Sequence, residues 1–201
     1  SRSDKTIFGV DVDQNISLIN IEANQIIQKY TYTNNKFYLH SNLEVNDDDN
    51  LLHFNGHIFC TRSGKLINSF ERFNSFVSGI FMPFYLQILI NSELWDLRTF
   101  KLLSIINDFH ETVLKRNHND ILVAHSISEE TKLHTRVIDR LHSWFFGPML
   151  PGNSLSFYES KHFNILAKKI SFPEYIFVFD VNQEGKKFLT LNNSVISPTS
   201  L

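Results

Sequence analysis

Residues 92–100 have the sequence Ser-Glu-Leu-Trp-Asp-Leu-Arg-Thr-Phe. Residues 93–97 are expected to form a short strand, on which successive side chains point to opposite faces. Residues 98–100 are expected to form the turn that follows it. A strand that ends in a Trp-Asp dipeptide is typical of the repeats that build propeller blades. The dipeptide alone is a weak signal, so its value depends on whether the flanking sequence repeats.

The flanking sequence does repeat. Residues 18–27, 58–67 and 94–103 align without gaps, at steps of 40 and 36 residues, and each segment ends in two apolar residues. A period near 40 residues with four short strands per unit is typical of a β-propeller blade, whereas a β-sandwich would lack this register. We therefore predict an all-β fold: a partial WD-repeat β-propeller of about three full and two partial blades over residues 1–201. Because propellers close to protect their edges, we interpret the chain as a fragment, or a divergent form, of a larger propeller.

Short apolar runs bounded by turn residues give the predicted strands. These are residues 6–12, 16–21, 25–31, 36–40, 51–54, 57–61, 65–70, 77–82, 87–90, 93–97, 101–106, 111–115, 121–127, 155–159, 165–170, 175–181 and 187–191. A helix over residues 16–30 remains an alternative, because residues 22–28 contain good helix formers. The acidic run at 47–49 is expected in a solvated polar loop, and residues 194–201 in a frayed end.

One segment departs from the strand pattern. Residues 128–144 carry apolar side chains mostly at steps of three and four, after a plausible N-cap at Ser128, which predicts a helix. We place an insertion at residues 128–152, between two blade strands. Its apolar stripe either packs on the propeller itself or forms a recruitment element or lid.

Composition narrows the class of protein. The chain has 201 residues, of which 42% are hydrophobic, and this suffices for one domain with a core. With 19 basic and 21 acidic residues the net charge is −2, which argues against direct nucleic-acid binding. No apolar run approaches the roughly 18 residues that span a bilayer, so no membrane contact is expected. The single cysteine, Cys60, favours a reducing compartment, and we expect the nucleus and cytoplasm.

No pattern in the sequence predicts catalysis. The nine histidines are scattered and no two have a metal-ligand spacing on a confident helix. A glycine-rich phosphate loop and a Gly-any-Ser-any-Gly elbow are both absent from the sequence, and Cys60 lacks the surroundings of a nucleophile. We therefore expect a protein that is not an enzyme, without catalytic residues, metal site or cofactor.

A more specific signal covers residues 63–107. This run opens with Ser-Gly-Lys-Leu-Ile-Asn-Ser-Phe-Glu-Arg-Phe-Asn, passes through Ser-Gly-Ile-Phe at 78–81, and continues with Glu-Leu-Trp-Asp-Leu-Arg-Thr-Phe-Lys-Leu-Leu at 93–103. It resembles the C-terminal WD-repeat domain of the Vpr-binding-protein family. The resemblance is weaker but collinear over residues 30–193, and the family also has an insertion at the place of residues 128–152.

The resemblance implies an adaptor. The family is a substrate receptor of cullin-4 RING ubiquitin ligases, so we expect a chain that docks to the linker, damaged-DNA-binding protein 1, and recruits proteins for ubiquitination. In this family the arginines of two Trp-Asp-any-Arg motifs, at the ends of consecutive blades, reach the linker. The second motif is intact as Trp95-Asp96-Leu97-Arg98. The first falls on residues 59–62, Phe-Cys-Thr-Arg, which keep the arginine, Arg62, but lack Trp and Asp.

Each of these residues also has a structural interpretation. Arg98 and Arg62 either present a planar, multi-donor guanidinium to the partner or form hydrogen bonds within their own blades. We expect Trp95 to pack, Asp96 to tie down its turn, and Cys60 to be a small buried apolar residue. The competing function is a structural or scaffolding propeller without a ligase link, because a fold alone does not fix function.

Overall fold

A computed structural model describes residues 5–11, 13–32, 42–70, 73, 77–83, 86–110, 112–116, 121–126, 152–159, 162–181, 187–192 and 196–200. These residues form β-strands and one short 3₁₀ helix, η1 (Asn107–Phe109). The chain divides into two compact units, residues 1–81 and residues 82–201. Each unit is described by itself.

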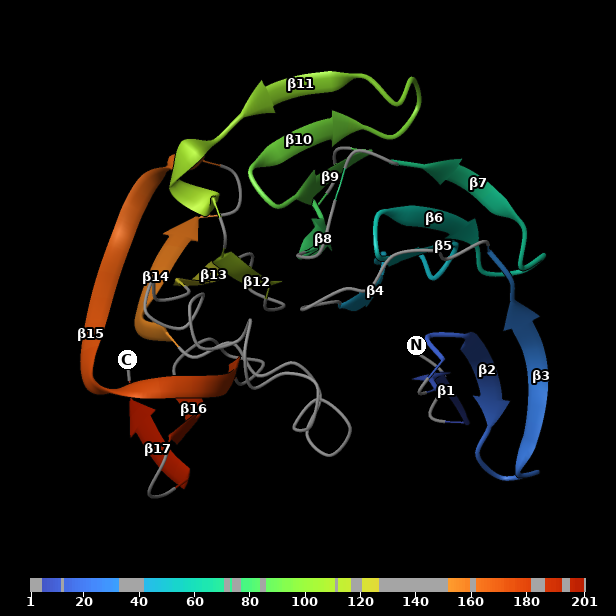
Figure 1. Ribbon diagram of the computed structural model, residues 1–201, viewed down its shortest axis with the longest axis horizontal. Coiled ribbons are helices and arrows are strands. Elements are labelled where there is room, and N and C mark those ends of the chain that lie inside the picture. The colour runs from blue at the N-terminus through green and yellow to red at the C-terminus, as the bar shows by residue number, and fades with distance from the viewer. Residues whose placement is uncertain are drawn as a thin grey trace. The chain divides into compact units, whose positions relative to one another are not determined.

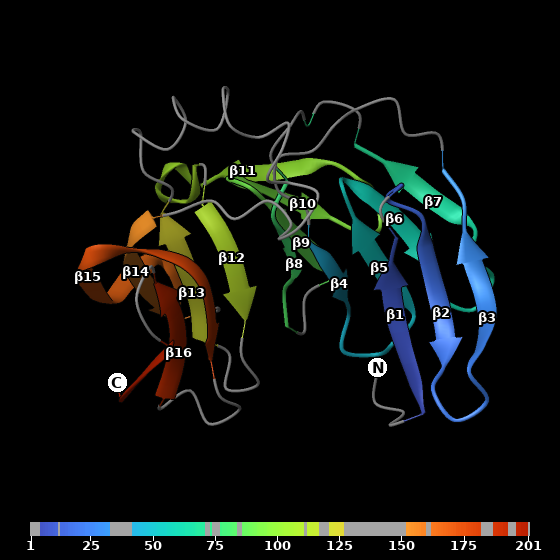
Figure 2. The ribbon, with the colours of Figure 1, turned by 60° about the horizontal axis from the view of Figure 1, so that its bottom comes forward.

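The first unit contains two antiparallel meanders, β1-β2-β3 and β4-β5-β6-β7, in which strands that follow one another in sequence lie side by side (Figures 1 and 2). A final short strand, β8, ends the unit. The strands are β1 (Thr6–Val10), β2 (Ile16–Asn20), β3 (Gln25–Tyr30), β4 (Leu43–Val45), β5 (Leu51–Phe54), β6 (His57–Cys60), β7 (Leu66–Ser69) and β8 (Gly79–Phe81).

The second unit continues the same scheme, with a meander of β9, β10 and β11 followed by antiparallel strands from β12 to β17. Its strands are β9 (Gln87–Ile90), β10 (Glu93–Asp96), β11 (Leu102–Ile105), β12 (Thr112–Arg116), β13 (Ile121–Ser126), β14 (Gly152–Glu159), β15 (His162–Val181), β16 (Lys187–Asn192) and β17 (Ile196–Ser200).

Strand β15 is 20 residues long and belongs to two ladders. Its first part, from His162, pairs with β14, whereas its end, to Val181, pairs with β16. Figure 1 shows the strand changing direction between these parts. The sequence predicted two separate strands, 165–170 and 175–181, and their separation is wrong. The strand is continuous, but it closes one meander, β12-β13-β14-β15, and opens the next, β15-β16-β17.

The hairpin between β5 and β6 shows how local sequence sets these meanders. Asn55 and Gly56 both have positive φ, at 50° and 78°. This is the backbone of a two-residue hairpin turn whose twist matches that of its strands, and Asn-Gly is its preferred dipeptide. The predicted tight turn is therefore confirmed.

Apolar side chains at alternate strand positions form the cores. In the first unit the core draws on both meanders, and its members are each at most 2% exposed: Ile16, Tyr30, Leu52, Phe54 and Phe59. Burying one such side chain contributes about 1.5–3 kcal/mol to stability. In the second unit Val123, Leu155 and Phe157 form a corresponding cluster.

The all-β prediction is confirmed, and the consecutive antiparallel meanders are consistent with a partial β-propeller. The favoured strands at 16–21 and 25–31 form as β2 and β3, and the alternative helix over residues 16–30 does not, because the two strands pair with each other. Besides the separation within β15, two further details of the prediction were wrong. Residues 43–45, expected in a polar loop, form β4. The expected frayed end contains β17, which pairs with β16.

Two predictions fall outside the described residues: the strand at 36–40 and the helix at 128–144. Strands β13 and β14, which flank residues 127–151, pair directly with one another. Among the residues that the structure describes, no helix is long and apolar enough to cross a membrane.

Candidate partner-binding site

Strand β10 carries the Trp-Asp dipeptide at its end. The strand pairs with β9 on one side and β11 on the other. Its four residues are each at most 9% exposed, including Leu94 at 7% and Trp95 at 9%. Trp95 therefore packs, as the sequence predicted, and holds the end of the strand in place.

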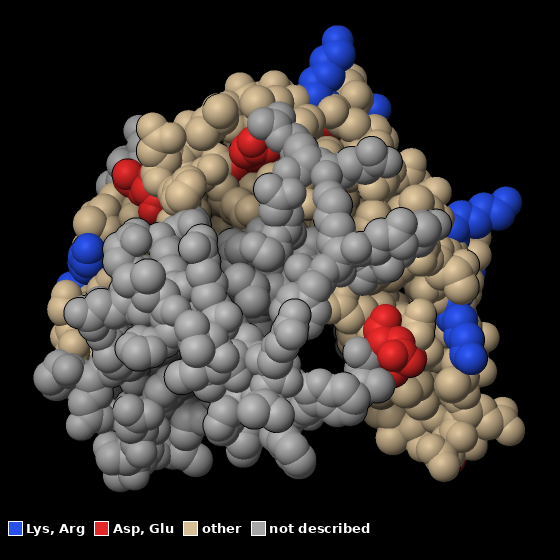
Figure 3. Space-filling model, viewed as in Figure 1, with Lys and Arg blue, Asp and Glu red and all other residues tan. Residues whose placement is uncertain are grey.

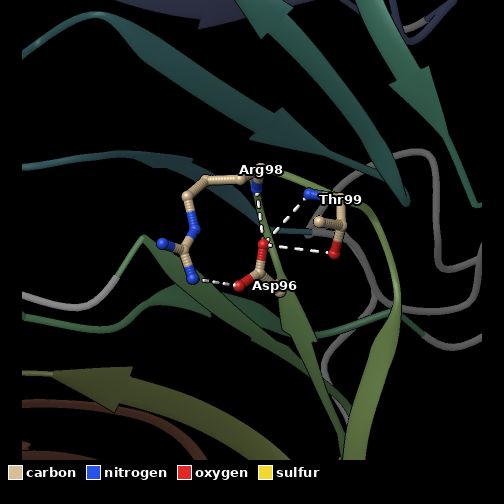
Figure 4. A network of polar contacts seen from close by, with 3 residues as sticks. All are labelled: Asp96, Arg98 and Thr99. Atoms are coloured by element: carbon tan, nitrogen blue, oxygen red, sulfur yellow. Dashed lines mark hydrogen bonds and ion pairs between the residues drawn. The ribbon is translucent and has the colours of Figure 1, made fainter.

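Asp96 organises the turn that follows β10 (Figure 4). Its Oδ1 accepts hydrogen bonds from the backbone N–H groups of Arg98, at 2.8 Å, and Thr99, at 3.0 Å, and from the Thr99 hydroxyl, at 3.3 Å. Its Oδ2 accepts a hydrogen bond from the Arg98 guanidinium at 2.8 Å. The prediction that Asp96 ties down its turn is confirmed.

In the ion pair between Asp96 and Arg98, one side chain is exposed and the other is nearly buried. The Arg98 side chain is 70% exposed, whereas that of Asp96 is 9% exposed. The guanidinium and the two backbone N–H groups hold the pKa of Asp96 well below its ordinary value, and the carboxylate raises the pKa of Arg98. A guanidinium has five N–H donors in a planar fork. Arg98 is therefore anchored at one nitrogen while most of its surface faces solvent.

The hairpin between β6 and β7 repeats this turn. Cys60 N–H donates to the Lys65 carbonyl at 2.9 Å, as Asp96 N–H donates to the Lys101 carbonyl at 3.0 Å. In both hairpins the strand register shifts by one residue just before this point. Cys60 therefore takes the place of Asp96.

A second hydrogen bond completes the match between the two turns. Gly64 N–H donates to the carbonyl of residue 60 at 2.9 Å, and Phe100 N–H to that of residue 96 at 2.8 Å. Both donors have positive φ, 68° for Gly64 and 52° for Phe100. The two turns thus share one conformation, and Arg62 takes the place of Arg98. Arg62 is exposed.

Cys60 differs from its prediction. It is partly exposed, not a buried apolar residue. The side chain and backbone of Ser63, and the backbone of Arg62, lower the pKa of the Cys60 thiol from its ordinary value. The sulfur therefore lies where N–H and O–H groups converge, as the Asp96 carboxylate does in the other turn, although a thiol is a weaker acceptor than a carboxylate.

The Arg62 turn is fastened to the preceding meander. The buried Tyr30 hydroxyl, at the end of β3, donates to the Thr61 carbonyl at 2.8 Å. Gly64 lies so close to β3 that an added Cβ would overlap the Gln28 side chain. These supporting residues were not predicted. Tyr30 and Thr61 are 31 positions apart, so only the three-dimensional fold brings them together.

The hairpin between β2 and β3 has the same turn. Its register also shifts after Leu18, and Asn24 has a positive φ of 48°, as Gly64 and Phe100 do. Asn20 takes the place of the carboxylate and accepts a hydrogen bond from Ala23 N–H at 2.9 Å. The alignment of Leu18 with Ile58 and Leu94 is therefore confirmed, but this copy carries Glu22 where the others carry arginine.

The acidic run at residues 47–49 lies between β4 and β5. Asp47 and Asp48 are exposed, as expected for a solvated loop, and Asp49 is partly buried. Within the described residues, no group of three His, Cys, Asp or Glu side chains could hold a metal ion. Figure 3 shows one face of the molecule with Lys and Arg in blue and Asp and Glu in red.

The known proteins that are similar to part of the chain include the following two. "Protein mahjong" of Drosophila melanogaster is 36% identical over 90 residues, which cover 45% of this chain and 6% of that protein. "DDB1- and CUL4-associated factor homolog 1" of Arabidopsis thaliana is 30% identical over 95 residues, or 47% of this chain and 5% of that protein. The matched stretch is thus a small part of these relatives. No protein-family model matches the chain.

The second of these names states an association with DDB1 and CUL4. Over slightly less than half of its length, this chain is therefore similar to a segment of a DDB1- and CUL4-associated factor.

Proposed function

We propose that this chain is part of a non-enzymatic substrate receptor of a cullin-4 RING ubiquitin ligase, as in the Vpr-binding-protein family. In this proposal Arg98 docks to damaged-DNA-binding protein 1 (DDB1), and other surfaces recruit proteins for ubiquitination. Arg62 forms a second contact with DDB1. Trp95 and Asp96 support the contact by fixing the end of β10 and the turn after it.

The observation that carries this proposal is the guanidinium of Arg98 at the end of a rigid strand. The side chain is 70% exposed, and its turn is fixed by the hydrogen bonds of a carboxylate that is only 9% exposed. A preorganised arginine loses little conformational entropy on binding, and arginine is enriched among the residues that dominate interface energies. The similarity to a DDB1- and CUL4-associated factor supports DDB1 as the partner.

One observation favours the alternative, a scaffolding module without a ligase link. Arg98 already donates to Asp96 within its own hairpin, at 2.8 Å. Were this the whole role of Arg98, the residue would stabilise the turn and contribute nothing to a partner. The guanidinium has five N–H donors and bonds Asp96 through one nitrogen, which leaves donors for a second role.

Co-purification with DDB1 separates the two functions. The chain, together with the flanking sequence of its full-length protein, is expressed with tagged DDB1 as wild type, Arg98→Ala and Arg62→Ala. We expect wild type to co-purify, Arg98→Ala to lose most of the bound DDB1, and Arg62→Ala to lose part of it. Lys65→Ala, an exposed cation three positions from Arg62, is the matched control for loss of positive charge. Failure of the wild type to co-purify would favour the scaffold.

A further inference from the structure

In each of the three equivalent turns, a backbone N–H donates a hydrogen bond to the carbonyl of the residue just before a neighbouring strand. Ile21 N–H donates to the Lys5 carbonyl at 2.8 Å. In the second copy Thr61 N–H donates to the Asn50 carbonyl at 3.1 Å, and in the third Leu97 N–H donates to the Leu86 carbonyl at 2.7 Å. Residues 5, 50 and 86 each come immediately before a strand, β1, β5 and β9. They occupy one position, which we call the flanking position.

The first copy shows where a side chain at the flanking position reaches. Lys5 Nζ lies 3.3 Å from Glu22 Oε2, and both side chains are exposed. Glu22 occupies the place of Arg62 and Arg98 in the other copies. A side chain at the flanking position is therefore a neighbour of the side chain at the arginine position. By this equivalence, Asn50 neighbours Arg62 and Leu86 neighbours Arg98.

Leu86 stands out at this position. It is 58% exposed, more than any other large apolar side chain that the structure describes. Its two counterparts, Lys5 and Asn50, are polar, so the fold does not require an apolar residue here. Arginine is enriched among interface hot spots, and neighbouring contacts serve to exclude water from them.

We infer that Leu86 is a further contact and specificity-determining residue of the Arg98 site. This inference rests on the proposed function. The partner surface that fits the pair is a carboxylate or carbonyl acceptor for Arg98 beside an apolar pocket for Leu86. Burial of Leu86 also removes water from around the guanidinium, which strengthens the hydrogen bonds of Arg98 to the partner.

The second copy of the turn lacks this combination. Asn50 is polar, and it follows the exposed acidic residues Asp47 and Asp48 in the loop that contacts the Arg62 turn, where Thr61 Oγ1 donates to the Asp49 carbonyl at 2.6 Å. The flanking position therefore supplies no apolar contact beside Arg62. Arg98, with Leu86 beside it, is therefore the stronger of the two contacts.

The test is calorimetric titration of DDB1 with wild type, Leu86→Asn, Ile105→Asn and Arg98→Ala. Asn is the residue of the second copy at the flanking position. Ile105, 57% exposed, pairs with Glu93 at the far end of the hairpin from Arg98 and is the matched control. We expect Leu86→Asn to weaken binding about tenfold, because its apolar area is no longer buried against the partner, and Ile105→Asn to leave it unchanged. Thermal midpoints of all variants are compared with that of the wild type.

The outcomes distinguish the inference from the proposed function. If wild type binds and Arg98→Ala loses binding, but Leu86→Asn binds like wild type, the inference is wrong and the proposed function stands. The inference also fails if Ile105→Asn weakens binding as much as Leu86→Asn does. If wild type does not bind DDB1, both are wrong.

Discussion

Cys60 and Asp96 occupy the same position in two hairpins, and the N–H of each donates to the carbonyl five residues later, at 2.9 and 3.0 Å. The backbone of the turn is therefore retained although the carboxylate is lost in one copy. In the Asp96 copy the carboxylate accepts hydrogen bonds from the N–H groups two and three residues on. In the Cys60 copy a polarised thiol lies there instead, so the turn is held by a weaker acceptor.

Restoring the carboxylate is expected to stabilise the Arg62 turn. In Cys60→Asp the new Oδ atoms accept hydrogen bonds from the N–H groups of Arg62 and Ser63, and charge-assisted bonds are stronger than those to a thiol. We expect the free energy of unfolding to rise by about 1 kcal/mol, measured by urea denaturation at pH 7. Cys60→Ala, which provides no acceptor, is the control and is expected to be less stable than wild type. A Cys60→Asp variant no more stable than Cys60→Ala would contradict this account.

Asp96 is expected to make stability depend on acid pH. Its pKa in the folded chain lies below the ordinary value of 3.8, so its contribution is fully present above about pH 4 and is lost as pH falls through the folded pKa. Wild type is therefore expected to exceed Asp96→Asn in stability at pH 7, and this difference should shrink below pH 4. Thermal unfolding of both proteins from pH 7 to pH 2.5 measures it. A difference that stays constant with pH would show that the carboxylate charge is not responsible.

His53 gives a second pH effect, over a different range. It is fully buried in β5, and its Nε2 accepts the Gly56 N–H at 3.2 Å. Burial, together with the neighbouring His57, lowers the pKa of His53 from 6.5 to about 3. The unfolded chain thus binds a proton that the folded chain does not, and His53 makes stability fall as pH decreases from about 6.5 toward 3.

Replacing His53 should remove this dependence. When the unfolded chain binds one more proton than the folded chain, the free energy of unfolding changes by about 1.4 kcal/mol per pH unit. Between pH 6.5 and 4.5 we expect the free energy of unfolding of wild type to fall more steeply than that of His53→Leu, by up to this amount. Leucine is chosen as the substitute because Leu89 occupies in β9 the register position that His53 occupies in β5. If His53→Leu does not fold, His53→Gln is measured in its place. His110→Gln, at an exposed histidine, is the control. Equal slopes in wild type and the His53 variant would refute the assignment.

The His53 side chain leaves no space for a side chain at position 79, which is glycine. An added Cβ at Gly79 would overlap the His53 imidazole. Gly79 cannot move away freely, because the Asn42 side chain pairs with its N–H at 2.9 Å and with its carbonyl at 2.7 Å. We expect Gly79→Ala to destabilise the chain by about 1–3 kcal/mol, as overpacking does.

A double-mutant cycle tests the cause of that loss. In the His53→Ala background the space is free, so Gly79→Ala should cost much less than it does in wild type. The coupling between the two substitutions, measured by urea denaturation, is expected to be about 1 kcal/mol or more. Additive effects would mean that the overlap with the imidazole is not the source.

The sequence predicted the repeating part of the fold because that part depends on local pattern. The alignment of Leu18, Ile58 and Leu94 is confirmed as the residue before the register shift in all three hairpins. Elements with weak local signals were missed. Strand β4 has three residues with a charged one, Glu44, in the middle, and β17 is defined mainly by its pairing with β16.

The candidate site could be assembled from the sequence only in part, for a related reason. The resemblance pointed to Arg98 and Arg62, and the Trp-Asp dipeptide to the turn. Leu86 gave no signal, because its place beside the turn depends on the pairing of β9 with β10 and on the hydrogen bond from Leu97. The position of Cys60 was aligned correctly, but its polar surroundings come from Ser63, whose orientation depends on the turn conformation.

The proposed function depends on binding of DDB1 by the exposed guanidinium of Arg98. The most direct measurement is the affinity of purified DDB1 for wild type and for Arg98→Ala, by isothermal titration, with the thermal midpoint of each protein recorded alongside. We expect Arg98→Ala to weaken binding by at least about tenfold, or ~1.4 kcal/mol. The thermal midpoint should change little, because Asp96 keeps the hydrogen bonds from the backbone N–H groups of residues 98 and 99. Equal affinities for the two proteins, or a lower affinity of Arg98→Ala that follows only from unfolding, would contradict the claim.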